Sequence, residues 1–146
     1  MMKVIVVSGT PGAGKTVFAK KLAEEKDYEY IDVNRLIEEK NIFDEYDKEK
    51  KCYVVDIKIL NKELVKLIQS KDVKGLVIDS HLAHNIDPKH IDECVIVKCE
   101  LKELEKRLKA RGYSSEKIRE NLDSEIFDVC LIEAKEKGHD VRVVRN

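Results

Sequence analysis

Short apolar runs alternate with amphipathic segments along the chain, and this alternation predicts the architecture. Runs rich in Val and Ile predict five buried strands, at residues 3–9, 28–33, 75–81, 93–100 and 140–145. Apolar residues spaced three and four apart predict helices at 15–26, 34–41, from Asp56 onward, at 101–111, and from Ser114 or Ser115 to Gly138. Strands that alternate with helices favour an α/β domain with a parallel sheet covered on both faces.

The same spacing predicts which side of each helix faces the core. In the first helix we expect Val17, Phe18, Leu22 and Ala23 to point inward. In the helix over 101–111 we expect the same of Leu101, Leu104 and Leu108. In the last helix the inward set is Ile118, Leu122, Ile126, Val129 and Cys130. Residues 42–55 are polar and predicted to be irregular, and loops of that length are usually functional.

Composition narrows the class of protein. A chain of 146 residues with 42% hydrophobic residues is expected to form one domain, residues 1–146, with its own core. A net charge of -1 argues against nucleic-acid binding by bulk attraction, although a local basic patch stays possible. Because the first apolar run stops at Ser8 and no run approaches a membrane span, we expect a soluble, cytoplasmic protein without membrane contact. The four cysteines, Cys52, Cys94, Cys99 and Cys130, lack metal-site spacing and are expected to be buried thiols.

Residues 9–16, GTPGAGKT, match the phosphate-binding loop G-x-x-x-x-G-K-[ST] between a predicted strand and a predicted helix. Gly12 and Gly14 allow the backbone N–H groups to turn toward phosphates, and the start of the helix adds a positive field. Lys15 is expected to reach the β- and γ-phosphates, and the Thr16 hydroxyl to bind Mg²⁺. A glycine-rich turn without a ligand is the alternative.

An acid ends the third predicted strand. Asp79 is placed to hold Mg²⁺ directly or through water, although a capping or turn role is the alternative. His81 would share a face with Asp79 if the strand continued, and it could then orient water or contact phosphates; a neutral turn histidine is as plausible from spacing alone. His81 and His84 form H-x-x-H without a third ligand nearby, which makes zinc improbable.

Two arginines, Arg107 and Arg111, lie four residues apart on one helix, beside Gly112. Phosphoryl transfer needs positive charge on the migrating group, so this arrangement is typical of a closing lid. The alternative is a set of surface salt bridges for these arginines and Arg119, with partners among Glu103, Glu105 and Glu116.

Four segments together resemble the adenylate kinase isoenzyme 6 family: GTPGAGKT, YIDV before FDEYDKEKK, VIDSH, and KRLKARGYSSEKIRENLDSEIF, in which Lys106 stands where a Glu is common. The resemblance covers nearly the whole chain and implies an adenylate-kinase-like P-loop fold with strand order 2-3-1-4-5. It also implies phosphoryl transfer from ATP to a nucleoside monophosphate, AMP foremost, an ATPase activity, and a role in maturing the small ribosomal subunit through a uS11-type ribosomal protein.

The resemblance also implies residue roles. It assigns ATP binding to Gly12, Ala13, Gly14, Lys15, Thr16 and the backbone of Val17, with Mg²⁺ held by Thr16 and Asp79. Asp79 and His81 match the family's D-x-H, and Arg111 closes on ATP, so that Lys15, Asp79, His81, Arg107 and Arg111 form the expected catalytic set. Residues 32–55 match the monophosphate-binding segment and residues 110–121 the lid.

One position departs from the family pattern. Many relatives carry an Arg where this chain has Glu38, and the nearest arginine is Arg35, so whether Arg35 takes over the contact with the acceptor phosphate is open. Two alternative functions stay open: an ATP-driven assembly factor with little kinase role, and a P-loop kinase for another small molecule such as shikimate. A GTPase switch is disfavoured because NKEL at 61–64 lacks the final Asp of N-K-x-D.

Overall fold

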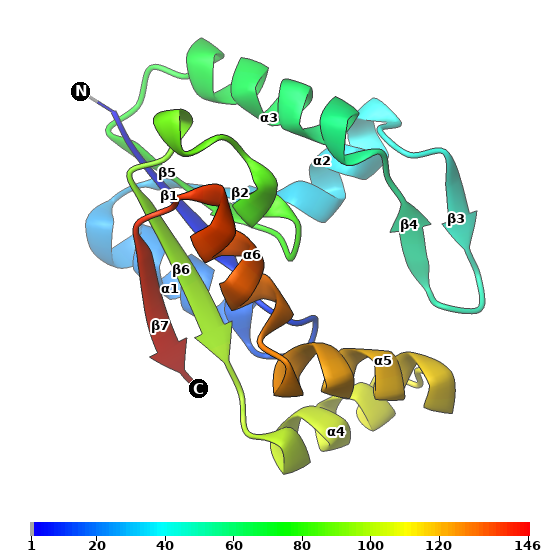
Figure 1. Ribbon diagram of the computed structural model, residues 1–146. Coiled ribbons are helices and arrows are strands. Elements are labelled where there is room, and N and C mark those ends of the chain that lie inside the picture. Colours follow the sequence, from blue (N-terminus) through cyan, green and yellow to red (C-terminus); the bar gives the residue numbers. More distant parts are fainter. Residues whose placement is uncertain (1) are drawn as a thin grey trace.

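The computed structural model describes residues 2–146, and its centre is a five-stranded parallel sheet (Figure 1). The strands are β1 (Lys3–Ser8), β2 (Glu29–Asp32), β5 (Gly75–Asp79), β6 (Glu93–Lys98) and β7 (Val141–Arg145). They lie in the order β2-β5-β1-β6-β7. Counted among these five strands alone, the order is 2-3-1-4-5, so the predicted fold class is confirmed; the labels run higher because a separate hairpin supplies β3 and β4.

The register of the sheet determines where polar side chains can gather. Asp79, the last residue of β5, pairs with Val7 of β1 on one side and with Asp32 of β2 on the other. Parallel strands end at the same edge of a sheet, so the phosphate loop after β1 and the acid at the end of β5 are neighbours.

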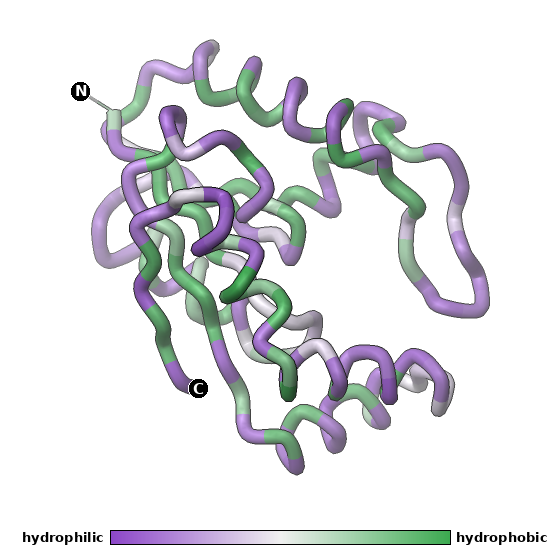
Figure 2. Tube along the Cα trace, viewed as in Figure 1, coloured by the Kyte–Doolittle hydropathy of each residue, from purple (hydrophilic) through white to green (hydrophobic). Residues whose placement is uncertain are grey.

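Helices cover both faces of the sheet, as predicted. One face packs α1 (Lys15–Lys26), α4 (Leu101–Ala110) and α5 (Ser115–Ile126) against Ile5, Val7 and Val77. The other packs α2 (Val33–Lys40), α3 (Ile57–Ser70) and α6 (Val129–Lys137), with the short helical turn η1 (Ala83–Asn85), against Val4, Val6 and Ile78. A second such turn, η2, spans Pro88–His90. Figure 2 shows the strands as apolar segments enclosed by helices with purple outer sides.

The predicted long C-terminal helix is wrong, because it divides into α5 and α6 at Phe127 and Asp128. Asp128 adopts a left-handed conformation, with φ 53°, which ends the helical ladder. The break directs the Asp128 carboxylate to the buried Lys98 ammonium, 2.6 Å away. Ile126 and Val129 flank the break and are exposed, contrary to the prediction.

Residues 42–55 are not irregular throughout, since they contain the antiparallel hairpin of β3 (Glu45–Asp47) and β4 (Cys52–Val54). The hairpin is held by aromatic packing: the Tyr53 ring lies 4.6 Å from Phe43 and 5.1 Å from Tyr46, centroid to centroid. Three-residue strands with charged neighbours carry too short an alternation for pattern analysis to detect.

Other predictions were confirmed or corrected by burial. Asp56 caps α3, accepting a hydrogen bond from the Lys58 N–H, and Gly112 follows α4 with φ 74°. Val17 and Leu101 are exposed rather than inward. All four cysteines are free thiols; Cys94, Cys99 and Cys130 are buried, whereas Cys52 is only half-buried. Among residues 2–146, no helix combines the length and apolar character that crossing a bilayer requires.

Candidate active site

Residues 9–14 form the loop that joins β1 to the first turn of α1. Gly12 and Gly14 have φ 93° and 96°, which non-glycine residues rarely adopt. A Cβ on Gly12 would lie 3.0 Å from the Leu108 side chain, so the loop packs closely on α4. Gly14 caps α1 without any side-chain hydrogen bond to the first-turn N–H groups. Those N–H groups are therefore donors suited to an anion.

Three side chains from distant parts of the chain hold this loop. The Thr10 hydroxyl donates to Glu125 Oε1 at 3.0 Å, Arg107 donates to the Gly12 carbonyl at 3.2 Å, and the Asn146 amide donates to the Ala13 carbonyl at 3.1 Å. Arg107 also forms a 3.2 Å ion pair with Glu103. Arg107 therefore makes one of the surface pairs named as the alternative and also supports the loop, while its role in a closing lid stays a prediction.

A buried charged cluster lies behind the loop. Glu125 accepts from Lys98 Nζ at 2.8 Å and from the Cys99 N–H at 2.7 Å, in addition to Thr10. Burial lowers the pKa of Lys98, but hydrogen bonds with Asp128 and Glu125 outweigh it and leave that pKa raised. The phosphate loop is thus fixed to the junction of α5 and α6, a link with no motif in the sequence.

Asp79 faces the loop with one oxygen bonded and one without a partner. The Tyr30 hydroxyl donates to Asp79 Oδ2 at 2.6 Å, whereas the buried Oδ1 has no hydrogen-bond partner. Burial and the bond to Asp79 raise the pKa of Tyr30, and a hydrogen bond with Thr16 opposes them. Tyr30, Thr16 and Asp79 therefore lie together, and the unpartnered carboxylate oxygen beside a hydroxyl suits a magnesium ion.

Lys15, Asp79 and Arg111 interact electrostatically. Burial lowers the pKa of Lys15, the Asp79 charge opposes that shift, and the Arg111 charge adds to it. Among residues 2–146, no three His, Cys, Asp or Glu side chains gather as a metal site. Magnesium at a nucleotide site does not require such a cluster, because substrate phosphates and water complete its coordination.

His81 lies in a turn beyond β5, because the strand ends at Asp79 and the Ser80 N–H donates to the Val7 carbonyl. The assumption of strand alternation for His81 is therefore wrong, yet its side chain still lines the same cavity as Lys15. Burial, followed by the charges of Lys15, His84 and Lys117, lowers the pKa of His81 to about 4. The imidazole is thus neutral at physiological pH.

The neighbouring His84 has a different environment. Its ring lies 2.8 Å from the Ser8 hydroxyl and 3.2 Å from Glu133, and its side chain is almost fully buried. Burial lowers the pKa of His84, and the hydrogen bond with Glu133 opposes that shift. His84 therefore contacts Ser8, the last residue of β1 before the loop, and does not pair with His81 around a metal.

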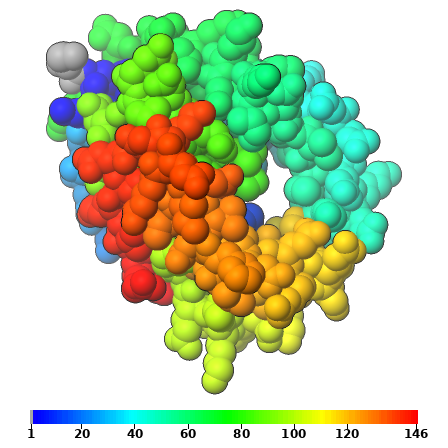
Figure 3. All heavy atoms as spheres, in the orientation of Figure 1, coloured from blue at the N-terminus to red at the C-terminus, as the bar shows by residue number. Residues whose placement is uncertain are grey.

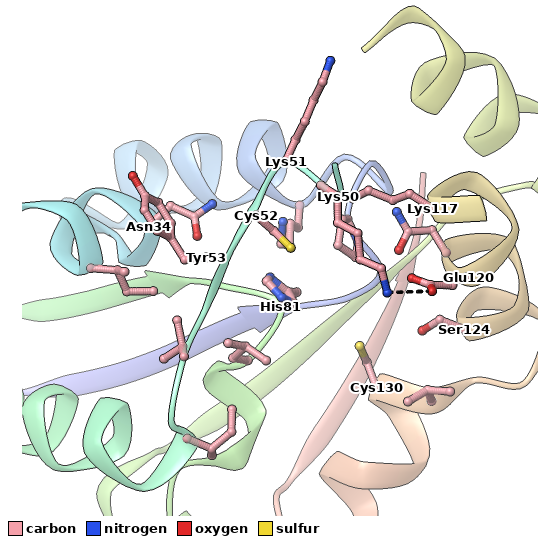
Figure 4. A pocket seen from close by; sticks show the side chains of 18 of the residues that line it. Asn34, Lys50, Lys51, Cys52, Tyr53, His81, Lys117, Glu120, Ser124 and Cys130 are labelled. Carbon is pink, nitrogen blue, oxygen red and sulfur yellow. Dashed lines mark hydrogen bonds and ion pairs between the residues drawn. The ribbon is translucent and has the colours of Figure 1, made fainter. Parts of the chain in front are cut away.

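A cavity of about 610 Å³ brings together Lys15, His81 and Arg111, whereas Thr16, Tyr30 and Asp79 are not among the residues that line it. In Figure 3 the cyan hairpin and the yellow α5 frame a hollow with the N-terminal residues, in blue, at its back. The close view in Figure 4 shows side chains from α2, the hairpin, α5 and the His81 turn around it. Its lining includes Pro11, Lys15, Asn34, Glu38, Tyr53, His81, Arg111, Tyr113, Lys117, Glu120 and Cys130.

The rim of the cavity is bridged by the tip of the hairpin. Lys50 Nζ lies 3.0 Å from Glu120 Oε1, the pair drawn with a dashed line in Figure 4. Lys51 Nζ donates to the Gly112 carbonyl at 3.2 Å, and Lys117 Nζ donates to the Lys50 carbonyl. Segments about 65 residues apart in the chain thus meet over the cavity, as these pairs show.

Arg35 and Glu38, the two residues considered where the chain departs from the family pattern, have different surroundings. Arg35 is exposed and pairs with Glu39 at 2.9 Å. Glu38 lines the cavity, and its hydrogen bond raises the pKa of the Tyr53 hydroxyl. Arg119 also points outward, pairing with Asp123 at 3.0 Å rather than with the expected glutamates. Arg111, by contrast, lines the cavity.

Comparisons with known proteins agree with this geometry. The family model for the AAA domain matches residues 5–128. The adenylate kinase isoenzyme 6 homolog of Schizosaccharomyces pombe is 37% identical over 133 residues, covering 90% of this chain and 74% of that protein. A Methanosarcina barkeri protein, whose name also refers to adenylate kinase, is 38% identical over 133 residues, 91% of this chain and 71% of its own. Shikimate kinase from Bacteroides thetaiotaomicron shares the fold, with TM-score 0.61 at 16% identity over 99% of this chain and 87% of that one.

Proposed function

The chain belongs to the adenylate kinase isoenzyme 6 family, and on that premise we propose that it is an ATP-dependent nucleoside monophosphate kinase. One observation carries the proposal: a single cavity is lined by Lys15 of the phosphate loop, His81, Arg111 at the end of α4, and the hairpin of residues 45–54. A donor phosphate site and room for a second substrate are therefore contiguous, as direct transfer between two nucleotides requires.

In this proposal the loop binds the triphosphate. The first-turn N–H groups of α1, which have no side-chain cap, donate to phosphate oxygens, Lys15 contacts the β- and γ-phosphates, and Arg111 closes from the lid, residues 110–121. Arg107 acts through the loop, since its guanidinium holds the Gly12 carbonyl. Thr16 and Asp79 would hold Mg²⁺, which when bound neutralises charge between the β- and γ-phosphates.

Tyr30 and His81 complete the transfer site. Tyr30 fixes one oxygen of Asp79 and leaves the other, which has no hydrogen-bond partner, available to a cation. The neutral His81 ring, beside Lys15 in the cavity, offers one donor and one acceptor for orienting an attacking oxygen or a water. The bridge between the hairpin and α5 limits access of water, which favours transfer to the acceptor over hydrolysis; a residual ATPase activity follows when the acceptor is absent.

The acceptor is proposed to be a nucleoside monophosphate, with AMP foremost, bound against residues 32–55. Asn34, Glu38 and Tyr53 line that end of the cavity and offer hydrogen bonds suited to a base or a ribose. The preference for AMP has its support in the family names of the relatives.

The kinase proposal is tested by incubating the pure protein with ATP, Mg²⁺ and each of AMP, CMP, UMP and GMP, with shikimate as a further arm. ADP formation that depends on AMP supports the proposal. ATP turnover that is the same with every monophosphate contradicts it and favours an ATPase, and transfer to shikimate alone favours a different small-molecule kinase. Asp79→Asn serves as the inactive control.

A role in assembling the small ribosomal subunit in the cytoplasm, with a uS11-type protein as partner, is a second proposal that rests on the family resemblance alone. It is compatible with kinase activity. Capture of that ribosomal protein by the purified chain, in a nucleotide-dependent manner, supports it; failure to capture the protein with and without ATP counts against it.

A further inference from the structure

Two lysines are buried among residues 2–146, and their surroundings differ. Lys98 is 7% exposed and forms ion pairs with Glu125 at 2.8 Å and Asp128 at 2.6 Å. Lys117 is 8% exposed, and within the described part of the chain no carboxylate forms an ion pair with it. A buried charge normally requires a counter-charge or several hydrogen bonds, so Lys117 calls for an explanation.

The groups around Lys117 compensate its charge only in part. Its Nζ lies 4.0 Å from the centroid of the Tyr113 ring and donates to the Lys50 carbonyl. An ammonium has three N–H donors, and a carbonyl accepts from one of them. A ring face and one carbonyl thus leave capacity for a strong anionic acceptor.

Lys117 is also placed on the cavity. It lines the same cavity as Lys15, His81 and Arg111, and Figure 4 shows its side chain beside Lys50 at the cavity wall. Its charge contributes to the lowered pKa of His81, which indicates that the two side chains are close. Lys117 therefore lies beside the hairpin on the same cavity to which the kinase proposal assigns the donor and acceptor phosphates.

We propose that the Lys117 ammonium binds phosphate oxygens where the donor and acceptor phosphates meet. It would supply there a positive charge, which the glutamate at position 38 cannot. The proposal rests on the kinase function above. During transfer the bond from the γ-phosphorus to the ADP oxygen breaks as an acceptor phosphate oxygen bonds to that phosphorus. Lys117 forms no covalent bond and keeps its protons; it stabilises charge on the migrating group.

A purely structural role makes a different prediction. If Lys117 only fastened the hairpin to α5, its loss would resemble loss of the neighbouring contact of Lys50 with Glu120. Lys50→Met removes that contact and leaves the Lys117 ammonium in place. The pair of variants therefore separates phosphate binding from fastening.

The experiment compares Lys117→Met, Lys117→Arg and Lys50→Met with Lys109→Met, a change at an exposed lysine of α4 that pairs with Glu105. We measure ADP formation from ATP and AMP, and the melting temperature of each variant. Loss of one transition-state cation lowers kcat by about a hundredfold in Lys117→Met. We expect Lys117→Arg to recover most of that loss and Lys109→Met to stay within about threefold of wild type. Lys50→Met, which breaks one exposed pair at the rim, should lower kcat by less than about tenfold. Lys117→Met activity equal to that of Lys50→Met overturns the proposal.

A binding measurement keeps this proposal separate from the kinase function. Calorimetric titration with inorganic tripolyphosphate should show affinity at least about tenfold weaker for Lys117→Met than for Lys109→Met, since one charged contact is lost. If wild type transfers to no monophosphate yet this difference appears, the kinase function fails and the phosphate site stands. If wild type is a kinase and both the rate and the affinity of folded Lys117→Met match wild type, the Lys117 site alone is wrong.

Discussion

The floor and the rim of the cavity are built from different interactions. The floor, where the loop of residues 9–16 beside the end of β5 presents Pro11 and Lys15 to the cavity, is held by buried contacts such as the hydrogen bond that Thr10 donates to Glu125. The rim, where the hairpin meets α5, is held by long charged side chains; Lys50 and Glu120 remain 39% and 48% exposed in their pair. Exposed pairs contribute little free energy, whereas buried networks are costly to break. The floor is therefore preorganised for phosphate, and the rim can separate to admit substrates.

This comparison predicts the largest effects at the floor. Lys15→Met and Asp79→Asn each remove a charged contact to the transferring group and should lower kcat/KM by at least about a hundredfold. A coupled ADP assay measures the loss. The matched control is Lys21→Met, an exposed lysine on the same helix as Lys15. Activity of either floor variant within tenfold of the control would contradict the assignment of the floor.

The buried cluster behind the loop should affect stability most. Glu125→Gln leaves Lys98 with one carboxylate and weakens the bond from Thr10, so we expect a loss of about 2 kcal/mol in the free energy of unfolding. Urea titration measures it. Glu105→Gln, which removes an exposed pair with Lys109, is the control and should change stability by less than about 0.5 kcal/mol. Equal effects in the two variants would show that the cluster does not anchor the loop.

The depressed pKa of His81, about 4, predicts a pH dependence of stability. An unfolded histidine titrates near 6.5, so below that pH the unfolded chain binds more protons than the folded one. The stabilising contribution is complete above about pH 6.5 and is lost as pH falls toward 4. Melting temperatures from pH 4 to 8 should show a smaller decline for His81→Asn than for wild type; identical curves would contradict the shifted pKa.

Tyr30 should have an intermediate effect on the rate. Tyr30→Phe removes the 2.6 Å bond that orients Asp79, and loss of one such positioning contact should lower kcat about tenfold. Tyr28→Phe is the control, because the Tyr28 ring contacts Lys26 through its face. Equal rates for Tyr30→Phe and Tyr28→Phe would show that the Tyr30 hydroxyl does not position Asp79 for the reaction.

The smallest effect belongs to the rim. Lys50→Met breaks an exposed ion pair and should change the free energy of unfolding by less than about 1 kcal/mol. Chemical denaturation followed by circular dichroism measures the change. A loss comparable to that of Glu125→Gln would mean that rim and floor do not differ in the way proposed.

Features that depend on local residue patterns could be predicted from the sequence, whereas features that depend on tertiary contacts could not. The loop motif and the cap at Asp56 depend on local residue patterns, whereas the strand order is implied by the family resemblance; the structure has all three as expected. The hairpin of residues 45–54 escaped detection because its strands are three residues long and are stabilised by aromatic packing with Phe43. The sequence places Tyr30 in a strand but does not reveal its hydrogen bond to Asp79, because the two residues lie 49 positions apart in the chain.

Two further features could be recognised only from the three-dimensional structure. The break at Asp128 follows from a tertiary ion pair with Lys98, which outweighs a helical pattern that continues through it. Arg35 and Glu38 are three residues apart on one short helix, and only the packing of α2 decides which of them lines the cavity. Local periodicity carries neither kind of information.

Calorimetric titration of ATP into the protein, with and without Mg²⁺, tests the central claim most directly. The account predicts one site per chain, binding that is lost in Lys15→Met, and a Mg²⁺-dependent gain in affinity that is lost in Asp79→Asn. Binding of ATP to Lys15→Met with the affinity of wild type would contradict it, because the triphosphate would then lie somewhere other than on the loop of residues 9–16.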